Sequence, residues 1–116
     1  MASRSVATVF MRVDIITLFP DMFSGPLNES ILRRAQGQGI LDLRIHCLRD
    51  FTKDRHRVVD DRPFGGGPGM VLKPEPVFEA VESLSTSGVR VVMMTPSGQR
   101  FRQEDAVKLS ECSHLI

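Results

Sequence analysis

One stretch of this sequence has an unusual density of side chains that can do chemistry. Residues 49–62 read RDFTKDRHRVVDDR, and nine of these fourteen residues carry a formal charge. Residues 63–70, PFGGGPGM, follow at once and hold four of the nine glycines of the chain. Basic side chains contact phosphates, and glycine leaves backbone N–H groups open to a phosphate or carbonyl oxygen. This composition predicts a long functional loop over residues 49–70, with no helix or strand.

Two adjacent carboxylates, Asp60 and Asp61, stand in this loop. Neighbouring side chains of an extended backbone point in opposite directions, so the pair is not expected to share a proton. One of them can instead accept hydrogen bonds from a ligand. The pairing edge of guanine fits such a site, because N1 and N2 offer N–H donors to a carboxylate while O6 accepts from a backbone N–H.

Simpler interpretations of the same residues stay open. A run of mixed charges is typical of a solvated surface with salt bridges, and a glycine run is typical of a flexible loop. Pro63 and Pro68 restrict the backbone and weigh against the flexible loop. The glycines match no P-loop, because no Gly-Lys-Ser/Thr follows. They match no dinucleotide pattern either, because Met70 stands where a third glycine belongs.

Two other places carry weaker signals. His46 and Cys47 are neighbours, but one histidine and one cysteine do not make a metal site. Residues 95–98, TPSG, follow a predicted buried strand, at the strand end where open α/β sheets bind ligands. The same string is equally typical of an ordinary strand-to-helix turn.

The elements that must position these residues follow from the apolar pattern. Buried strands are predicted over residues 13–19 and 89–94, a strand with one wet face over 41–48, and the start of another over 114–116. Helices are predicted over residues 31–36, with Ser30 as N-cap, and over 74–84 and 102–112, with a short helical turn over 21–23. The alternation predicts an α/β fold with a mainly parallel sheet and flanking helices.

Composition limits the class of protein. The 116 residues are 41% hydrophobic and 25% charged with a net charge of +1, which excludes a disordered chain and gives no general attraction to nucleic acid or membrane. Two separated cysteines exclude a disulfide-dense scaffold and fit a reducing cytosol. No apolar run approaches the ~20 residues that span a bilayer. We expect residues 1–10 to be an N-terminal extension and residues 11–116 one domain.

Four strings together closely resemble a known family. Residues 13–23 (VDIITLFPDMF), 50–57 (DFTKDRHR), 59–70 (VDDRPFGGGPGM) and 95–98 (TPSG) follow one another as in the N-terminal part of the bacterial tRNA (guanine-N1)-methyltransferases, knotted members of the SPOUT superfamily. The resemblance covers residues 11–116. It implies methylation of N1 of the guanosine on the 3′ side of the tRNA anticodon, with S-adenosylmethionine, by a cytoplasmic homodimer. It also suggests Mg²⁺, and it implies neither a membrane nor a DNA partner.

The resemblance assigns roles by position. The segment on one side of the adenosyl pocket is matched by Met94, Thr95, Pro96, Ser97 and Gly98. The residues that meet the target guanosine are matched by Asp60, Gly65 and Gly69, with Gly66 in the same run, and their basic surroundings by Arg55, His56, Arg57 and Arg62. No catalytic residue is assigned, because the general base of the family lies beyond the matching segment.

Members of this family continue past the position that matches Ile116. We therefore expect this chain to be the N-terminal part of the catalytic domain without the knot, an incomplete and inactive fragment. An alternative is a non-catalytic module that binds tRNA or dimerises. A weaker alternative is an unrelated phosphate-binding α/β protein.

Overall fold

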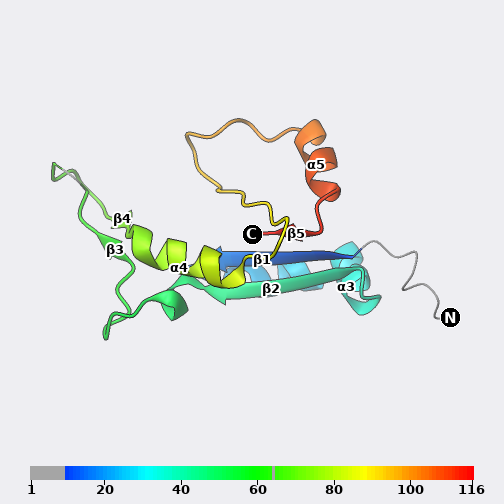
Figure 1. Ribbon diagram of the computed structural model, residues 1–116, viewed down its shortest axis with the longest axis horizontal. Coiled ribbons are helices and arrows are strands. Elements are labelled where there is room, and N and C mark those ends of the chain that lie inside the picture. The colour runs from blue at the N-terminus through cyan, green and yellow to red at the C-terminus, as the bar shows by residue number, and fades with distance from the viewer. Residues whose placement is uncertain (1–9, 64) are drawn as a thin grey trace.

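Figure 1 shows the computed structural model, which describes residues 10–63 and 65–116. Apart from Phe10, the expected N-terminal extension lies outside the described residues. The centre of the molecule is a parallel sheet with the strand order β2-β1-β5. Strand β1 (Met11–Thr17) pairs along its whole length with β2 (Leu41–Cys47), and its other edge pairs with β5 (His114–Leu115). The expectation of an α/β fold with a parallel sheet is confirmed.

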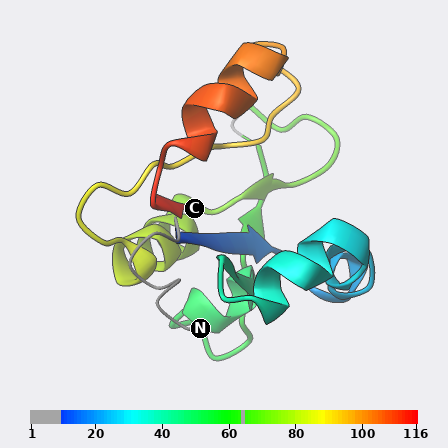
Figure 2. The ribbon, with the colours of Figure 1, turned by 90° about the vertical axis from the view of Figure 1, so that its right-hand side faces the viewer.

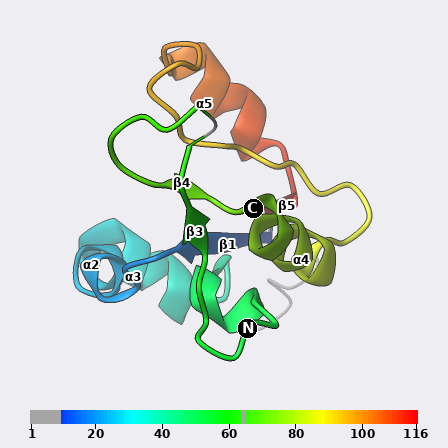
Figure 3. The same cartoon turned by 90° about the vertical axis from the view of Figure 1, so that its left-hand side faces the viewer.

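Three short helices connect β1 to β2. They are α2 (Asp21–Ser24), the 3-10 helix η1 (Pro26–Asn28) and α3 (Ser30–Gly37). Figures 2 and 3 place α2 and α3 on one side of β1 and α4 on the other. This is the arrangement of an α/β layer structure, in which crossover helices cover the faces of a parallel sheet.

The expectation that Ser30 caps α3 is wrong. Glu29 is the N-cap and has an extended backbone, because η1 ends immediately before it. Ser30 is the first helical residue and has a φ of 55°, and no side chain makes a capping hydrogen bond at this helix start. The helix end is as expected, since α3 stops at Gly37 and Gly39 has a φ of 73°.

The expected structureless loop contains two short elements. The chain leaves β2 through the 3-10 helix η2 (Leu48–Phe51), and the residues on either side of the glycine run form an antiparallel pair, β3 (Asp60–Asp61) with β4 (Val71–Leu72). The backbone N–H of Lys73 donates to the carbonyl of Val59 at 2.7 Å and closes the base of this hairpin. The prediction of a loop over residues 49–70 is therefore wrong at residues 49–51, which belong to η2, and at residues 60–61, which form β3.

Helix α4 (Pro74–Leu84) has the predicted bounds and contributes Ala80 and Val77 to the core. Ala80 is fully buried against Leu48 and Val59, with Phe51 and Val77 packed around them. Residues 53–58 of the charged loop are exposed, whereas Val59 is buried and holds the end of this segment against the core.

The predicted buried strand over residues 89–94 is wrong. Residues 90–92 lie parallel to residues 114–116 and share three backbone hydrogen bonds with them, but their pairing forms a single bridge, Arg90 with Leu115. Met93 and Met94 are 73% and 84% exposed. The hydrogen bonds to residues 114–116 end at residue 92, and in the described part of the chain Met93 and Met94 have no backbone partner. Figure 1 shows this segment continuing over the sheet toward α5 (Gln103–Ser110).

No helix among residues 10–63 and 65–116 is long and apolar enough to cross a membrane.

Candidate functional site

A cavity of about 890 Å³ opens between the charged loop (residues 49–62), the β3–β4 hairpin and the start of α4, and we call it the polar cavity. Charged side chains of both signs line it together with Phe51 and two prolines. Its walls are made by Phe51, Thr52, Lys53, Asp54, Val58, Asp61, Arg62, Val71, Leu72, Lys73, Pro74, Glu75, Pro76 and Glu79. A cavity of this size, with cations, carboxylates and a flat ring, can hold a nucleotide.

The tip of the charged loop has a defined turn. The Asp54 carboxylate accepts from the backbone N–H of His56 at 3.0 Å, and this hydrogen bond lowers the pKa of Asp54 below its usual value. Arg57 has a φ of 57°, its N–H donates to the carbonyl of Asp54, and its guanidinium pairs with Asp50. The turn exposes the side chains of Arg55, His56 and Arg57 to solvent, where they can meet an extended polyanion.

The glycines of the hairpin connection have the backbone that only glycine adopts easily. Gly65, Gly66 and Gly69 have φ values of 79°, 75° and 83°. A Cβ added at any of them meets no atom within 4 Å, so open space lies beside these residues. The glycines are therefore required here by backbone conformation, and another molecule can approach them from the side where a Cβ would stand.

The structure separates the two aspartates of the loop, as expected of neighbours in an extended chain. Asp61 is exposed and lines the polar cavity with Arg62, whereas Asp60 is half-buried in β3 and contributes nothing to the wall. Of the eight residues predicted to meet the target guanosine or its surroundings, Arg62 is the one on this wall. The others lie beside it, in the tip of the charged loop, in β3 and in the glycine connection.

A second cavity, of about 550 Å³, lies where β1, helix α4, residues 91–94 and residues 115–116 meet, and we call it the apolar cavity. Its lining is almost entirely aliphatic and includes Met93, Met94 and Phe101. Such a surface suits an adenine ring or a thioether chain. Of the five residues predicted to bind the adenosyl group, Met94 lines this cavity.

The remaining four form an exposed turn directly after Met94. Its internal contacts are a 3.1 Å hydrogen bond between the hydroxyls of Thr95 and Ser97 and a 3.2 Å hydrogen bond from the Gly98 N–H to the Thr95 carbonyl. Pro96 completes the turn. The residues present therefore fit one side of an adenosyl pocket: an apolar floor followed by a turn with exposed hydroxyls.

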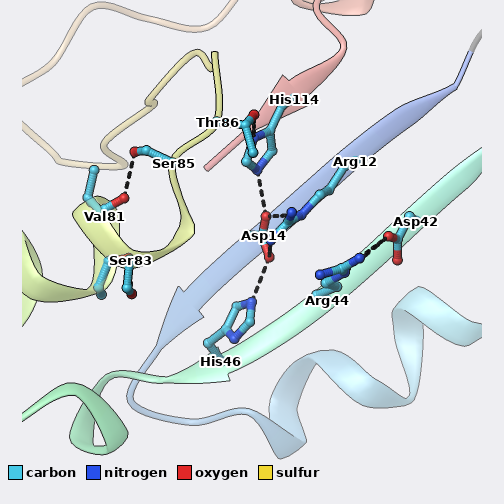
Figure 4. A network of polar contacts seen from close by, with 11 residues as sticks. Arg12, Asp14, Asp42, Arg44, His46, Val81, Ser83, Ser85, Thr86 and His114 are labelled. Atoms are coloured by element: carbon cyan, nitrogen blue, oxygen red, sulfur yellow. Dashed lines mark hydrogen bonds and ion pairs between the residues drawn. The ribbon is translucent and has the colours of Figure 1, made fainter. Parts of the chain in front are cut away.

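A buried cluster around Asp14 was not predicted from the sequence. Asp14 is 1% exposed in the middle of β1, and its two carboxylate oxygens accept from Nε2 of His46 at 2.7 Å and from Nε2 of His114 at 2.6 Å (Figure 4). Arg12 donates to the same carboxylate at 2.8 Å. The other ring nitrogen of His114 lies 2.6 Å from the Thr86 hydroxyl. One acidic residue inside an apolar run, VDIITL, is the signal in the sequence that marks this position.

The environment of Asp14 keeps it ionised. Burial raises the pKa of a carboxylate, but the hydrogen bonds from His46, His114 and Arg12 together outweigh burial and lower the pKa of Asp14 below 3.8. The cluster has the composition of a metal site with two histidines and one carboxylate. Here the histidine nitrogens donate directly to the carboxylate. In the described part of the chain no group of three or more His, Cys, Asp or Glu residues is arranged to hold a metal ion, so the suggested Mg²⁺ finds no fitting site there.

Comparisons with known proteins give a consistent match. Residues 11–116 match a family described as tRNA (Guanine-1)-methyltransferase TrmD. A protein named tRNA (guanine-N(1)-)-methyltransferase from Dictyoglomus turgidum is 52% identical over 106 residues, which cover 91% of this chain and 43% of the relative. Proteins of the same name from Geobacillus kaustophilus and Koribacter versatilis are 49% and 48% identical, again over 91% of this chain and over 44% and 42% of the relatives. The chain thus spans less than half the length of these curated relatives.

Proposed function

The chain belongs to the tRNA (guanine-1)-methyltransferase TrmD family, and from this we propose that it holds the target guanosine for methylation at N1, on the 3′ side of the tRNA anticodon. The observation that carries this proposal is the polar cavity. Its wall combines the cations Lys53, Arg62 and Lys73 with carboxylates, and it lies beside the open glycine connection. The cations can contact phosphates, the carboxylates can accept from a purine edge, and the Phe51 ring can stack on a base.

The chemistry requires precise placement of guanine N1. N1 carries a proton at neutral pH, which a base would remove as N1 takes the methyl group in line from the sulfonium sulfur of S-adenosylmethionine, with S-adenosylhomocysteine as the leaving group. In our proposal Asp60 accepts from the guanine edge, and the amides of Gly65 and Gly69 stabilise the negative charge that develops on O6. Gly66, whose own N–H donates to the Pro63 carbonyl, shapes the backbone of this run beside the guanosine. Arg55, His56, Arg57 and Arg62 hold the surrounding phosphates. The base that removes the N1 proton is not assigned to a residue of this chain.

S-adenosylmethionine supplies the electrophilic methyl group. We propose that Met94 contacts its adenosyl portion from the apolar cavity and that the turn formed by Thr95, Pro96, Ser97 and Gly98 lines one side of it. The aliphatic floor and the exposed hydroxyls of that turn support this placement. We propose further that the active form is a cytoplasmic homodimer with a SPOUT-type knot, as the resemblance implies. The exposed Met93 and Met94 are consistent with a surface that is covered in such an assembly.

Guanosine recognition can be tested by binding. An anticodon stem-loop RNA with inosine in place of the target guanosine lacks only the N2 amino group. Losing this donor to a carboxylate weakens binding by about tenfold. Fluorescence anisotropy should therefore give a higher Kd for the inosine RNA. Equal affinity of the unmodified chain for both RNAs contradicts guanine recognition.

Two matched variants locate the contact. Asp60→Asn is expected to remove the difference between guanosine and inosine, whereas Asp61→Asn is expected to keep it. If the difference disappears in Asp61→Asn instead, the guanine contact belongs to the aspartate on the wall of the polar cavity, and the role given to Asp60 is wrong.

A further inference from the structure

The Asp14 cluster links three strands through one carboxylate. His46 belongs to β2, His114 to β5 and Asp14 to the strand between them. The carboxylate accepts on Oδ1 from one neighbouring strand and on Oδ2 from the other. Because both oxygens are engaged in a buried place, neither strand can shift without leaving a buried donor or acceptor unpaired.

One arm of the cluster reaches the polar cavity. The His46 ring makes an edge contact with the Phe51 ring, with centroids 6.1 Å apart, and Phe51 lines that cavity. His46 also lies just before η2, the element that leads into the charged loop. A shift of the His46 ring would therefore move Phe51, and with it the wall where we place the guanosine.

The other arm reaches the segment that leads to the apolar cavity. The carbonyl of His114 accepts from the backbone N–H of Arg90 at 2.9 Å, and its ring nitrogen is bonded to the Thr86 hydroxyl. These contacts hold the chain on both sides of residues 87–89, and it then runs on to Met94 and the following turn. Asp14 itself lines the apolar cavity.

We propose that Asp14 is a positioning residue that sets the guanosine side and the adenosyl side of the site relative to each other. Each of its two hydrogen-bonded histidines positions one part of the site: His46 positions the wall of the polar cavity, and His114 positions residues 90–98. In this proposal, which rests on the proposed function, Asp14 acts through the two histidines, because both of its carboxylate oxygens accept hydrogen bonds from them. An in-line transfer is sensitive to such placement, because a displacement of about 1 Å can cost 100-fold in rate.

Substituting one histidine at a time distinguishes a positioning role of Asp14 from a general loss of stability. His46→Leu removes one donor and is expected to raise the Kd for the guanosine stem-loop RNA about tenfold, with the Kd for S-adenosylhomocysteine unchanged. His114→Leu is expected to raise the Kd for S-adenosylhomocysteine about tenfold and to leave the Kd for the RNA unchanged. His46→Gln and His114→Gln each keep an N–H donor near the Nε2 position and should restore the respective affinity. Asp14→Asn should weaken both.

The matched control is Asp42→Asn. Asp42 accepts from an arginine two residues away, as Asp14 does, but it lies on the surface and has no histidine partner. It should leave both affinities unchanged. A double-mutant cycle adds a further check, since His46→Leu should have little extra effect on RNA binding in the Asp14→Asn background.

The outcomes separate the two hypotheses. If the unmodified chain binds neither RNA nor S-adenosylhomocysteine, the proposed function fails and this inference fails with it. If it binds both, but each histidine variant weakens both ligands equally or glutamine gives no rescue, only the positioning role of Asp14 is overturned. Should Asp14→Asn fail to fold, the four histidine variants still decide the question.

Discussion

Replacing Asp14 with asparagine is expected to lower the free energy of unfolding by about 3 kcal/mol. The substitution keeps the side-chain size but removes the charge and turns one of two acceptor oxygens into an N–H donor. In the folded protein Oδ1 accepts from His46, and Oδ2 accepts from His114 and Arg12. An asparagine has one oxygen, so it can accept from one of the two histidines and presents an N–H to the other, whose present N–H then loses its acceptor.

The size of this loss depends on whether each hydrogen-bond partner of Asp14 can reach water once asparagine replaces the carboxylate. The side chain of Arg12 is 21% exposed and can turn toward water, whereas that of His114 is 4% exposed and cannot. A hydrogen bond to a charged group contributes about 1.5–3 kcal/mol, and the weakened ion pair with Arg12 adds to the loss of one such bond. A loss of about 3 kcal/mol corresponds to a fall in Tm of about 12 °C for a chain of this length.

Thermal and urea unfolding followed by circular dichroism at pH 7 measures this loss. Asp42→Asn is again the control, since its ion pair with Arg44 is exposed and its removal should cost about 0.5 kcal/mol or less. A loss below about 1 kcal/mol for Asp14→Asn would refute the role given to the buried carboxylate. Equal losses in the two variants would refute it as well.

Three further predictions concern pH, the glycine connection and the exposed methionines. The pKa of Asp14 is lowered in the folded protein, so the stabilisation by its carboxylate is complete above the usual value of 3.8 and disappears as the pH falls through the folded-state pKa. The Tm difference between the original chain and Asp14→Asn should therefore shrink in melts at successively lower pH below 3.8, and a constant difference contradicts this. Gly66→Ala should destabilise by about 1 kcal/mol in urea unfolding and weaken RNA binding, because φ is positive there, whereas Gly67→Ala should not; equal effects would be inconsistent with the strain argument. Met93→Ser with Met94→Ser should shift the chain from self-association to monomer in sedimentation velocity, and an already monomeric original chain would exclude this role for the methionines.

The elements whose own residues show a helical or strand-like pattern could be predicted from the sequence. Helix α4 has the predicted bounds because Pro74 suits the first turn and the apolar residues follow with helical spacing, which places Ala80 and Val77 in the core. Strands β1 and β2 are recognisable because β-branched and alternating residues dominate them.

Features that depend on distant partners could not be predicted. The apolar run at residues 89–94 has the composition of a buried strand, but burial requires neighbours that composition does not reveal, and the described chain covers little of it. The Asp14 cluster depends on strand register, because its histidines lie 32 and 100 residues away in the sequence. Asp60 and Asp61 were recognised as candidates, but which of them faces the polar cavity was decided by the pairing of β3 with β4.

The central claim is that residues 11–116 hold the guanosine for methyl transfer. The most direct test grafts them in place of the matching segment of the Dictyoglomus turgidum relative, to which they are 52% identical over 106 residues. The initial rate of methyl transfer to guanine N1 of a tRNA transcript is then measured. We expect a rate within about tenfold of the parent protein, lost in Asp60→Ala while S-adenosylmethionine binding persists. A folded graft that binds this cofactor but leaves N1 unmethylated, or an Asp60→Ala graft at the full rate, would contradict the account.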